Sequence, residues 1–172
     1  DEILSNYGIN ATRIFMISDS PPDRELEWTD TGIQSAKNLI NRIERYFQKP
    51  FTEINQKIEK EILRFIHEIE ININNFSLNK CVANIYSLFN FLEKNNIFLG
   101  NHNYSKDILI CLYPITPRLS SEIYFELFQT KLTLRNWPVI NKDLLIEENI
   151  NLPIQINGKF ITTISVKLNY EE

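Results

Sequence analysis

One segment in the first half of the chain spaces its apolar residues as an α-helix does. Between residues 52 and 73, apolar residues recur at Ile54, Ile58, Ile62, Phe65 or Ile66, Ile69 and Ile73. Steps of three or four residues place all of these side chains on one side of a helix. The remaining positions are rich in Lys, Arg and Glu. The segment Thr52–Ile73 is therefore predicted to be an amphipathic helix with one buried face.

Similar apolar spacing predicts further helices on both sides of this segment. They cover Asn6–Ser18, a stretch from Asp30 or Thr31 to Gln48, Leu78–Asn95, and two helices within Asp107–Phe128. Pro21 and Pro50 end the first two, since Pro disfavours helical geometry in the residue before it. Asp30 or Thr31 is predicted to cap the second helix. Pro114 and Pro117 cannot both lie in one unbroken helix, so we expect a bend there and a new helix near Pro117.

The apolar pattern changes to alternation after Thr130. Two alternating runs, Ile150–Ile156 and Phe160–Leu168, flank the pair Asn157-Gly158. Asn-Gly favours a type I′ turn because both residues tolerate positive φ. Pro153 in the first run indicates that one edge of that strand is unpaired. The fold class is therefore mainly α, a bundle of five or six helices followed by a β-hairpin.

Composition and charge restrict the classes of function. The formal net charge is −4 over 172 residues, which is not the strongly basic balance of many nucleic-acid-binding proteins, although a local basic face can still bind RNA. No apolar run reaches the roughly 20 residues of a membrane span, and the N-terminus does not resemble a signal peptide. Cys81 and Cys111 lie in apolar patterns without a nearby His, so we predict buried free thiols in a reducing compartment.

Residues that could carry catalysis are sparse. The sequence has no phosphate-binding Gly loop and no dinucleotide fingerprint. His67 lies on the charged helix and is expected to be solvated, and His102 lies in a polar connection and is not expected to be functional. Asp23, Glu25 and Glu27 alternate, and we interpret them as loop charges before a helix. We expect no catalytic residue and no metal site in this chain.

The second predicted helix has a basic side. Its basic residues are Lys37, Arg42, Arg45 and Lys49, and Glu44 is the only acid between Thr31 and Lys49. Asn38, Arg42, Arg45 and Lys49, called here the basic stripe, share one face over about 16 Å. Such a stripe can follow a phosphate backbone, which gives affinity but little sequence reading. The alternative is an ordinary solvated face, paired with acids of a neighbouring helix.

Several motifs occur along the chain in a fixed order. They are Ser20-Pro21-Pro22, Leu26-Glu27-Trp28, Asp30-Thr31-Gly32, Asn41-Arg42, Tyr113–Glu122, Trp137-Pro138 and Gln155–Lys159. In this order they resemble the bacterial leucyl-tRNA synthetases, and the resemblance spans nearly the whole chain. The helix over residues 52–73 is its least distinctive part.

The resemblance implies an architecture. Residues 1–29 would be a helix and linker that leave the catalytic core, residues 30–130 the anticodon-binding helical bundle of class I synthetases, and residues 131–172 the start of a small C-terminal α/β domain. In that family the ATP-activating loop, the nucleotide-binding fold and the editing domain all precede these parts. The full enzyme is implied to attach leucine to its tRNA with ATP and magnesium, whereas this chain alone is expected to be inactive and to need no cofactor.

The resemblance also implies a partner, tRNA(Leu), in the cytoplasm. Leucine has six codons, so its tRNAs share few anticodon bases, and we expect the bundle to hold the tRNA backbone rather than read the anticodon. The candidate RNA-binding residues are Lys37, Asn38, Arg42, Arg45, Lys49, Arg118 and Lys159. Lys159 is the main candidate in the hairpin, because Phe160–Thr163 replaces further basic residues of the family. Gln34-Ser35 also departs from a Glu-Gly that is frequent there. Trp28 and Trp137 are expected to pack against the bundle.

Two other functions remain open at this stage. The chain could be a helical protein-interaction module without a nucleic-acid role, which acidic charge and an exposed apolar patch would favour. It could also be the matching domain of another class I aminoacyl-tRNA synthetase. We expect a monomer that has neither DNA nor a membrane as a partner.

Overall fold

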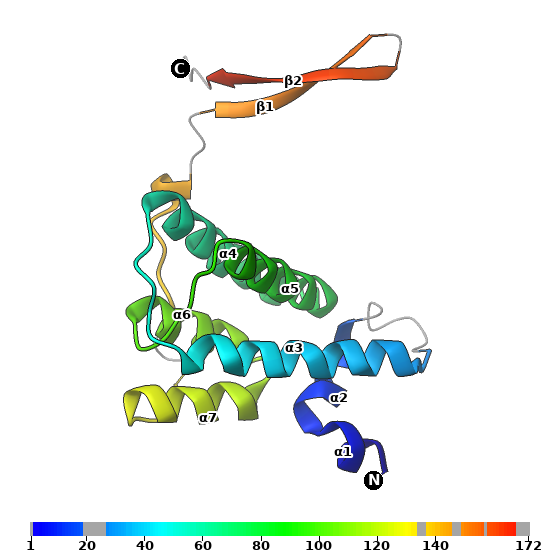
Figure 1. The fold of residues 1–172 in the computed structure, drawn as a ribbon, viewed down its shortest axis with the longest axis vertical. Helices are drawn as coiled ribbons and strands as arrows, with labels where there is room; N and C mark the ends of the chain where they lie inside the picture. Colours follow the sequence, from blue (N-terminus) through cyan, green and yellow to red (C-terminus); the bar gives the residue numbers. More distant parts are fainter. Residues whose placement is uncertain (1, 19–26, 134–136, 146–148, 157, 168–172) are drawn as a thin grey trace. The chain divides into compact units, whose positions relative to one another are not determined.

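The computed structural model describes residues 2–18, 27–133, 137–145, 149–156 and 158–167. The chain divides into two compact units, Asp1–Ile140 and Asn141–Glu172. The first is helical and the second holds a hairpin (Figure 1). The three-part division at residues 29 and 130 stays a prediction. None of the helices in the described residues is both long enough and apolar enough to cross a membrane.

The first unit is a bundle of α-helices, which confirms the predicted class. Its helices are α1 (Glu2–Tyr7), α2 (Ile9–Ser18), α3 (Asp30–Gln48), α4 (Gln56–Asn74), α5 (Leu78–Lys94), α6 (Asn103–Leu112) and α7 (Pro117–Phe128). Helices α4 and α5 form a pair, and α2 packs against both α3 and α5. Helix α7 runs alongside α3 (Figure 1). The bend between α6 and α7 falls at the predicted prolines.

One apolar core contains buried residues from each helix from α2 to α7. Its most buried large side chains include Ile14, Ile33, Ile43, Ile62, Ile66, Phe89 and Leu92. Ile58, Ile62 and Ile69 of α4 are all buried, so the spacing in residues 52–73 did identify a core-facing side. Cys81 and Cys111 are buried free thiols, as predicted, and burial raises the pKa of both. Trp28 lies edge-to-face against Phe15, with ring centroids 4.9 Å apart. Trp137 packs partly buried against the core.

The predicted first helix, Asn6–Ser18, is wrong in extent, because two helices meet at Gly8. Gly8 has a φ of +80°, and its N–H donates to the carbonyl of Leu4 at 3.0 Å. A left-handed residue at this point ends α1, and the chain restarts as α2 in a new direction. The expected stop at residues 19–23 lies outside the described residues.

The predicted start of the helix at Thr52 is also wrong. The N–H of Thr52 donates to the carbonyl of Phe98, and the hydroxyl of Thr52 accepts from the N–H of Phe98. These extended-chain bonds keep Thr52 out of the helix. Helix α4 starts after Asn55, whose side chain accepts from the N–H of Ile58 at 3.0 Å.

Two further helix starts differ from their predictions. Thr29, rather than Asp30 or Thr31, caps α3 by accepting from the N–H of Gly32 at 3.2 Å. Helix α6 starts at Asn103 rather than Asp107. His102 caps it by accepting from the N–H of Tyr104. The His102 ring also stacks on Phe51 with centroids 3.9 Å apart, so its side chain has a structural role.

The second unit contains the predicted β-hairpin. Strands β1 (Asn149–Ile156) and β2 (Lys159–Lys167) pair antiparallel, with Leu152 opposite Ile164 and an irregularity between Ile154 and Gln155. Gly158 has a φ of +77°, as a tight turn requires. Asn157 lies outside the described residues, so the type I′ turn stays a prediction. A short 3₁₀ helix, η2 (Lys142–Leu145), precedes the strands.

Candidate nucleic-acid interface

Helix α3 holds the basic stripe at the border of its buried face. Leu39, Ile43 and Phe47 fix the helix in the core. On the adjoining face Asn38, Arg45 and Lys49 are exposed, and Arg42 is partly buried. Asn38, Arg42 and Arg45 line one hollow on this side of α3, and Lys49 follows α3 as its C-terminal cap.

An acid from the neighbouring helix pairs with this stripe. Glu93 on α5 lies with one carboxylate oxygen 3.5 Å from Nη1 of Arg42 and the other 3.7 Å from Nη2 of Arg45. The alternative interpretation, a face paired with acids of a neighbouring helix, therefore describes part of what the stripe does. One carboxylate is shared by two guanidinium groups, so the stripe keeps a net positive charge.

Arg42 and Arg45 differ in how firmly they are held. The Arg42 side chain is 19% exposed, and its Nη2 donates to the backbone carbonyl of Tyr86 at 3.4 Å. The Arg45 side chain is 57% exposed and lies over the edge of the core, 5.9 Å from the centroid of Tyr46. Arg42 is thus a fixed charge and Arg45 an adaptable one.

Lys49 extends the stripe at the end of α3. Its exposed ammonium lies 4.2 Å from the ring centroid of Phe98, a distance that suits a cation–π contact. Lys49 itself is in an extended conformation, as expected for the residue before Pro50. The contact positions the charge at the surface without neutralising it.

The other sequence-predicted residues do not join the stripe. Lys37 donates from Nζ to the carbonyl of Asn6 at 3.1 Å and lies over the Tyr7 ring, which ties α3 to α1. Arg118 is on α7, where Nε donates to Glu122 at 2.8 Å, and this bond raises the pKa of Arg118. Lys159 is exposed on β2, in the second unit.

The two sides of α3 have opposite charge. Glu44 faces α7 and lines a hollow together with Glu122 and Glu126. Burial first, and then the charges of these two acids, raise the pKa of Glu44. A nucleic-acid backbone would be repelled from this side and attracted to the side of the basic stripe. This asymmetry disfavours Arg118, which stands beside Glu122, as a phosphate ligand.

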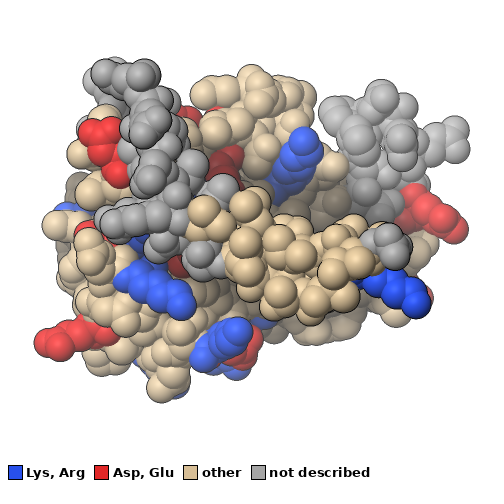
Figure 2. Space-filling view, turned by 90° about the horizontal axis from the view of Figure 1, so that it is seen from above, with Lys and Arg blue, Asp and Glu red and all other residues tan. Residues whose placement is uncertain are grey.

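Basic side chains are dispersed on one face of the molecule. On the face in Figure 2, Lys and Arg side chains stand singly among uncharged and acidic ones. This agrees with the acidic net charge of −4. On this face the cations are therefore not clustered as they are in the stripe.

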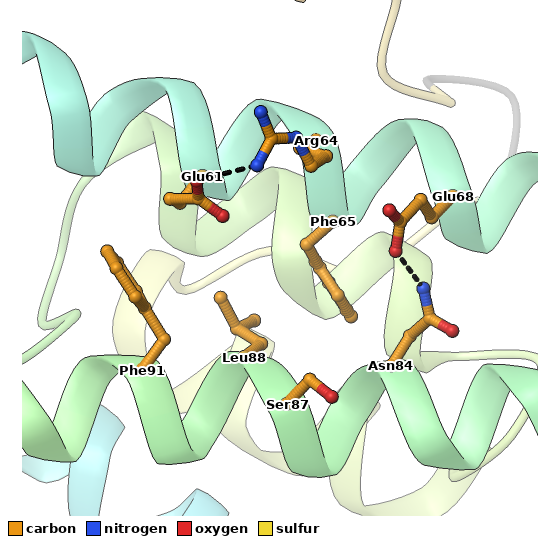
Figure 3. Close-up of a pocket in the computed structure, with 8 residues that line it drawn as sticks. All are labelled: Glu61, Arg64, Phe65, Glu68, Asn84, Ser87, Leu88 and Phe91. Atoms are coloured by element: carbon orange, nitrogen blue, oxygen red, sulfur yellow. Dashed lines mark hydrogen bonds and ion pairs between the residues drawn. The ribbon is translucent and has the colours of Figure 1, made fainter. Parts of the chain in front are cut away.

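A second hollow lies between α4 and α5 (Figure 3). Its polar groups pair with one another: Arg64 donates to Glu61, and Asn84 donates to Glu68. Phe65 and Leu88 lie between these pairs. Two acids against one base do not suit a phosphate, and we interpret this hollow as the seam of a helix pair.

Sequence reasoning missed two residues that line the stripe. Asn41 and Glu93 join Asn38, Arg42 and Arg45 around a hollow of about 370 Å³, called here the α3–α5 hollow. In the sequence, Asn41 stands out only as part of the Asn41-Arg42 motif. Nothing in the linear pattern brings Glu93, about fifty residues further along, to Arg42. Only the packing of α5 beside α3 does so.

Arg13 is a further residue without a predicted role. Its guanidinium donates to the carbonyls of Ile115 and Pro114, at 3.1 and 3.3 Å. It thereby ties α2 to the bend between α6 and α7. We interpret it as structural.

Comparison with known proteins places these features in a family. The sequence profile of the anticodon-binding domain of tRNA ligases matches residues 55–172. Leucine–tRNA ligase of Novosphingobium aromaticivorans is 29% identical over 96% of the chain and 20% of its own length. That of Zymomonas mobilis subsp. mobilis is 31% identical over 95% of the chain and 20% of its own length. The chain therefore spans about a fifth of the length of these relatives.

A solved structure has the same fold. The leucyl-tRNA synthetase agnB2 LeuRS of Agrobacterium radiobacter K84, solved in a ternary complex with tRNA and LeuAMS, superposes with a TM-score of 0.75. The match has 22% identity and covers 99% of this chain and 25% of that one. The chain belongs to the anticodon-binding domain family of tRNA ligases, and it is similar to the leucine–tRNA ligases along nearly its whole length.

Proposed function

We propose that this domain binds tRNA, specifically tRNA(Leu), and that the basic stripe of α3 contacts the sugar–phosphate backbone. The observation that carries the proposal is the exposure of Arg45 and Lys49 on one side of α3, in a chain of the anticodon-binding family. Cations in a row give affinity for phosphates and fix the position of the RNA. Asn38 and Arg42 extend the same row.

Backbone contact is favoured over base reading by the aromatic residues near the stripe. Tyr46 is buried, and Phe98 is partly buried and lies beneath Lys49. A reader of single-stranded bases needs exposed aromatic faces on which bases can stack. Among the described residues of the stripe and its immediate neighbours, the aromatic rings are used for packing instead.

The test is tRNA binding by charge-reversal variants. At low salt the chain should retain tRNA(Leu) on a filter, and the pair Arg45→Glu and Lys49→Glu should weaken binding at least about tenfold, because two attractive contacts become repulsive. The control pair is Lys57→Glu and Lys80→Glu, two exposed lysines of α4 and α5. This pair changes net charge equally, so it should weaken binding much less. Equal losses for both pairs would show that the stripe is not the RNA face.

Arg42 is left unchanged in this test for a structural reason. Replacing it would remove a donor to Tyr86 and leave Glu93 without its main partner. A loss of binding would then report the fold as well as the contact. Circular dichroism of the Arg45 and Lys49 variants should show unchanged helix content.

We also propose that the protein containing this domain attaches leucine to tRNA in the cytoplasm, with ATP and magnesium as its cofactors. The names of the relatives support this proposal. Charging of tRNA by the full-length protein would test it. Leucine should be attached in the presence of ATP and magnesium. Attachment of isoleucine or valine instead would favour another class I synthetase.

A protein-interaction module is the second candidate, because α1 and α2 carry an exposed apolar patch. Its residues are Leu4, Ile9 and Met16, which line one shallow hollow. We nevertheless propose a monomer that does not use DNA. Sedimentation should give the mass of one chain, and duplex DNA should displace tRNA poorly. A defined oligomer without tRNA affinity would favour the interaction module.

A further inference from the structure

The α3–α5 hollow combines the residues that a phosphate group requires. Two guanidinium groups, from Arg42 and Arg45, and two amides, from Asn38 and Asn41, surround it. Asn38, Asn41 and Arg45 are exposed, so a backbone at the surface can reach them. Arginine forks and amide N–H groups are donors that suit phosphate oxygens.

Glu93 is the anion that now faces these donors. Its oxygens are 3.5 and 3.7 Å from the nearest guanidinium nitrogens, longer than the roughly 2.8 Å of a charge-assisted hydrogen bond. The Glu93 side chain is also 53% exposed. Such a pair contributes little to stability, because water screens it and both side chains lose freedom. Glu93 can therefore turn out to solvent at small cost.

Arg42 carries a donor that no group of the described chain uses. Its Nε is buried and has no acceptor among the described residues, although Nη2 is bonded to Tyr86 and Nη1 faces Glu93. A buried donor without a partner costs free energy, so structures seldom leave one unsatisfied without a reason. This guanidinium is consequently fixed in place with its bonding capacity incompletely used.

We propose that the α3–α5 hollow is a phosphate site for the RNA backbone, and that Glu93 is an internal counterion displaced when a phosphate enters. The inference rests on the proposed function. It deepens that function by naming the subsite and the residue that opposes binding. Arg42 is the fixed arm of the site, and Arg45 is the arm that closes on the phosphate.

The exchange follows from the geometry. The Glu93 carboxylate is tethered to α5 and spans two guanidinium groups without reaching hydrogen-bond distance to either. A phosphate is not tethered to the protein and can approach both. Binding of an RNA phosphate also releases counterions that are condensed on the RNA, whereas the contact with Glu93 releases none. The Glu93 carboxylate thus competes with the phosphate for Arg42 and Arg45. Only a phosphate that is placed to bond both guanidinium groups displaces it.

The test removes the counterion charge without changing its shape. In Glu93→Gln the affinity of the chain for tRNA(Leu) at low salt should rise roughly two- to fivefold, the range expected when one competing surface ion pair is lost. Glu126→Gln, an exposed acid on α7, changes net charge equally and is the matched control. It should change the affinity less than about twofold. In an Arg45→Gln background the gain from Glu93→Gln should shrink, because the two residues act on one site.

A second readout does not depend on RNA. The NMR signals of the Nε–H groups of Arg42 and Arg45 are followed while inorganic phosphate is added. In Glu93→Gln these signals should shift at a lower phosphate concentration than in the unchanged chain. In Glu126→Gln they should shift at the same concentration as in the unchanged chain.

The outcomes separate the two proposals. If Glu93→Gln weakens tRNA binding, Glu93 positions the arginines and the counterion proposal is overturned. If tRNA binds but Glu93→Gln behaves like Glu126→Gln in both assays, the proposal is overturned while the proposed function stands. If tRNA does not bind but phosphate shifts Arg42 and Arg45 more readily in Glu93→Gln, the anion site is supported and the RNA function fails.

Discussion

Some positions in the fold leave no room for a side chain, and Gly100 is the most closely packed of the glycines. A Cβ on Gly100 would lie 2.3 Å from the backbone N of Phe51 and 2.8 Å from the carbonyl oxygen of Lys49, and its φ is +44°. Backbone atoms cannot move aside as a flexible side chain can. Gly8 also has a positive φ, +80°, but nothing lies within 4 Å of its Cβ position.

These two glycines allow a paired prediction. Gly100→Ala should lower the free energy of unfolding by about 3 kcal/mol or more, since overpacking adds to strain. Gly8→Ala should lower it by about 1 kcal/mol, the strain of a left-handed residue alone. Urea denaturation measures both. Equal losses would contradict the close approach at Gly100.

Tyr104 predicts how stability depends on alkaline pH. Burial, and then its hydrogen bond to Glu59, raise the pKa of Tyr104 to about 12 from 10.0. The raised pKa means that the folded chain resists losing this proton. The resulting stabilisation is complete below pH 10 and is lost as the pH rises from about 10 to about 12.

The measurement for Tyr104 is denaturation across this pH range. The difference in stability between the unchanged chain and Tyr104→Phe should shrink as the pH approaches 12, because only the unchanged chain has this hydroxyl to ionise. A difference that stays constant with pH would contradict the shift.

At the residue scale, sequence could predict the stripe but not its counterion. Arg42 and Arg45 share a face because of helical spacing alone, which is a local property, and Lys49 follows at the end of the same helix. Glu93 reaches them through the packing of two helices, and Lys37 turns to the carbonyl of Asn6 because α1 lies there. Contacts between elements are not encoded in the spacing of either element.

At the scale of elements, the cap of α3 gives a prediction that distinguishes neighbouring residues. Thr29→Ala should lower the free energy of unfolding by about 1 kcal/mol, because the N–H of Gly32 loses its acceptor. Thr31 lies two residues further along and is exposed, so Thr31→Ala should lower the free energy of unfolding much less. Thermal denaturation of both variants compares them. A larger loss for Thr31→Ala would place the cap where the sequence had suggested it.

Apolar periodicity identified the helices and the first residue of α5, Leu78, but it missed where α4 and α6 begin. The positions of Ile58, Ile62 and Ile69 repeat through α4 and predict its buried face. Its start depends instead on the bonds of Thr52 to Phe98, and the start of α6 depends on His102 stacking on Phe51. Both are tertiary contacts, which a linear pattern does not contain. The β-hairpin was predictable because its turn and alternation are local.

At the scale of the whole molecule, the two units should differ in local stability. The hairpin has two strands, and large side chains such as Ile156 and Phe160 are about 60% exposed, whereas Ile62 and Phe89 of the bundle are 0% exposed. A two-stranded hairpin is marginal by itself in water. Hydrogen exchange of the 172-residue chain should therefore be fast in β1 and β2 and slow in α4 and α5. Equal protection would contradict this division.

The order of a helical bundle followed by a hairpin was also predictable, since helical spacing and strand alternation occupy separate stretches of the chain. The opposite charges on the two sides of α3 were predictable only in part: the basic side belongs to α3 itself, whereas the acidic side gathers Glu122 and Glu126 of α7 around Glu44. An acidic chain can thus present a local basic face, which is the basis of the proposed function.

The salt dependence of tRNA binding tests that claim most directly. The logarithm of the binding constant should fall linearly with the logarithm of salt concentration, and each phosphate contact should contribute roughly one unit of slope. The pair Arg45→Gln and Lys49→Gln should reduce the slope by about two units. The pair Lys57→Gln and Lys80→Gln should leave it nearly unchanged. An unaltered slope for the Arg45 and Lys49 pair would contradict phosphate contact by the basic stripe.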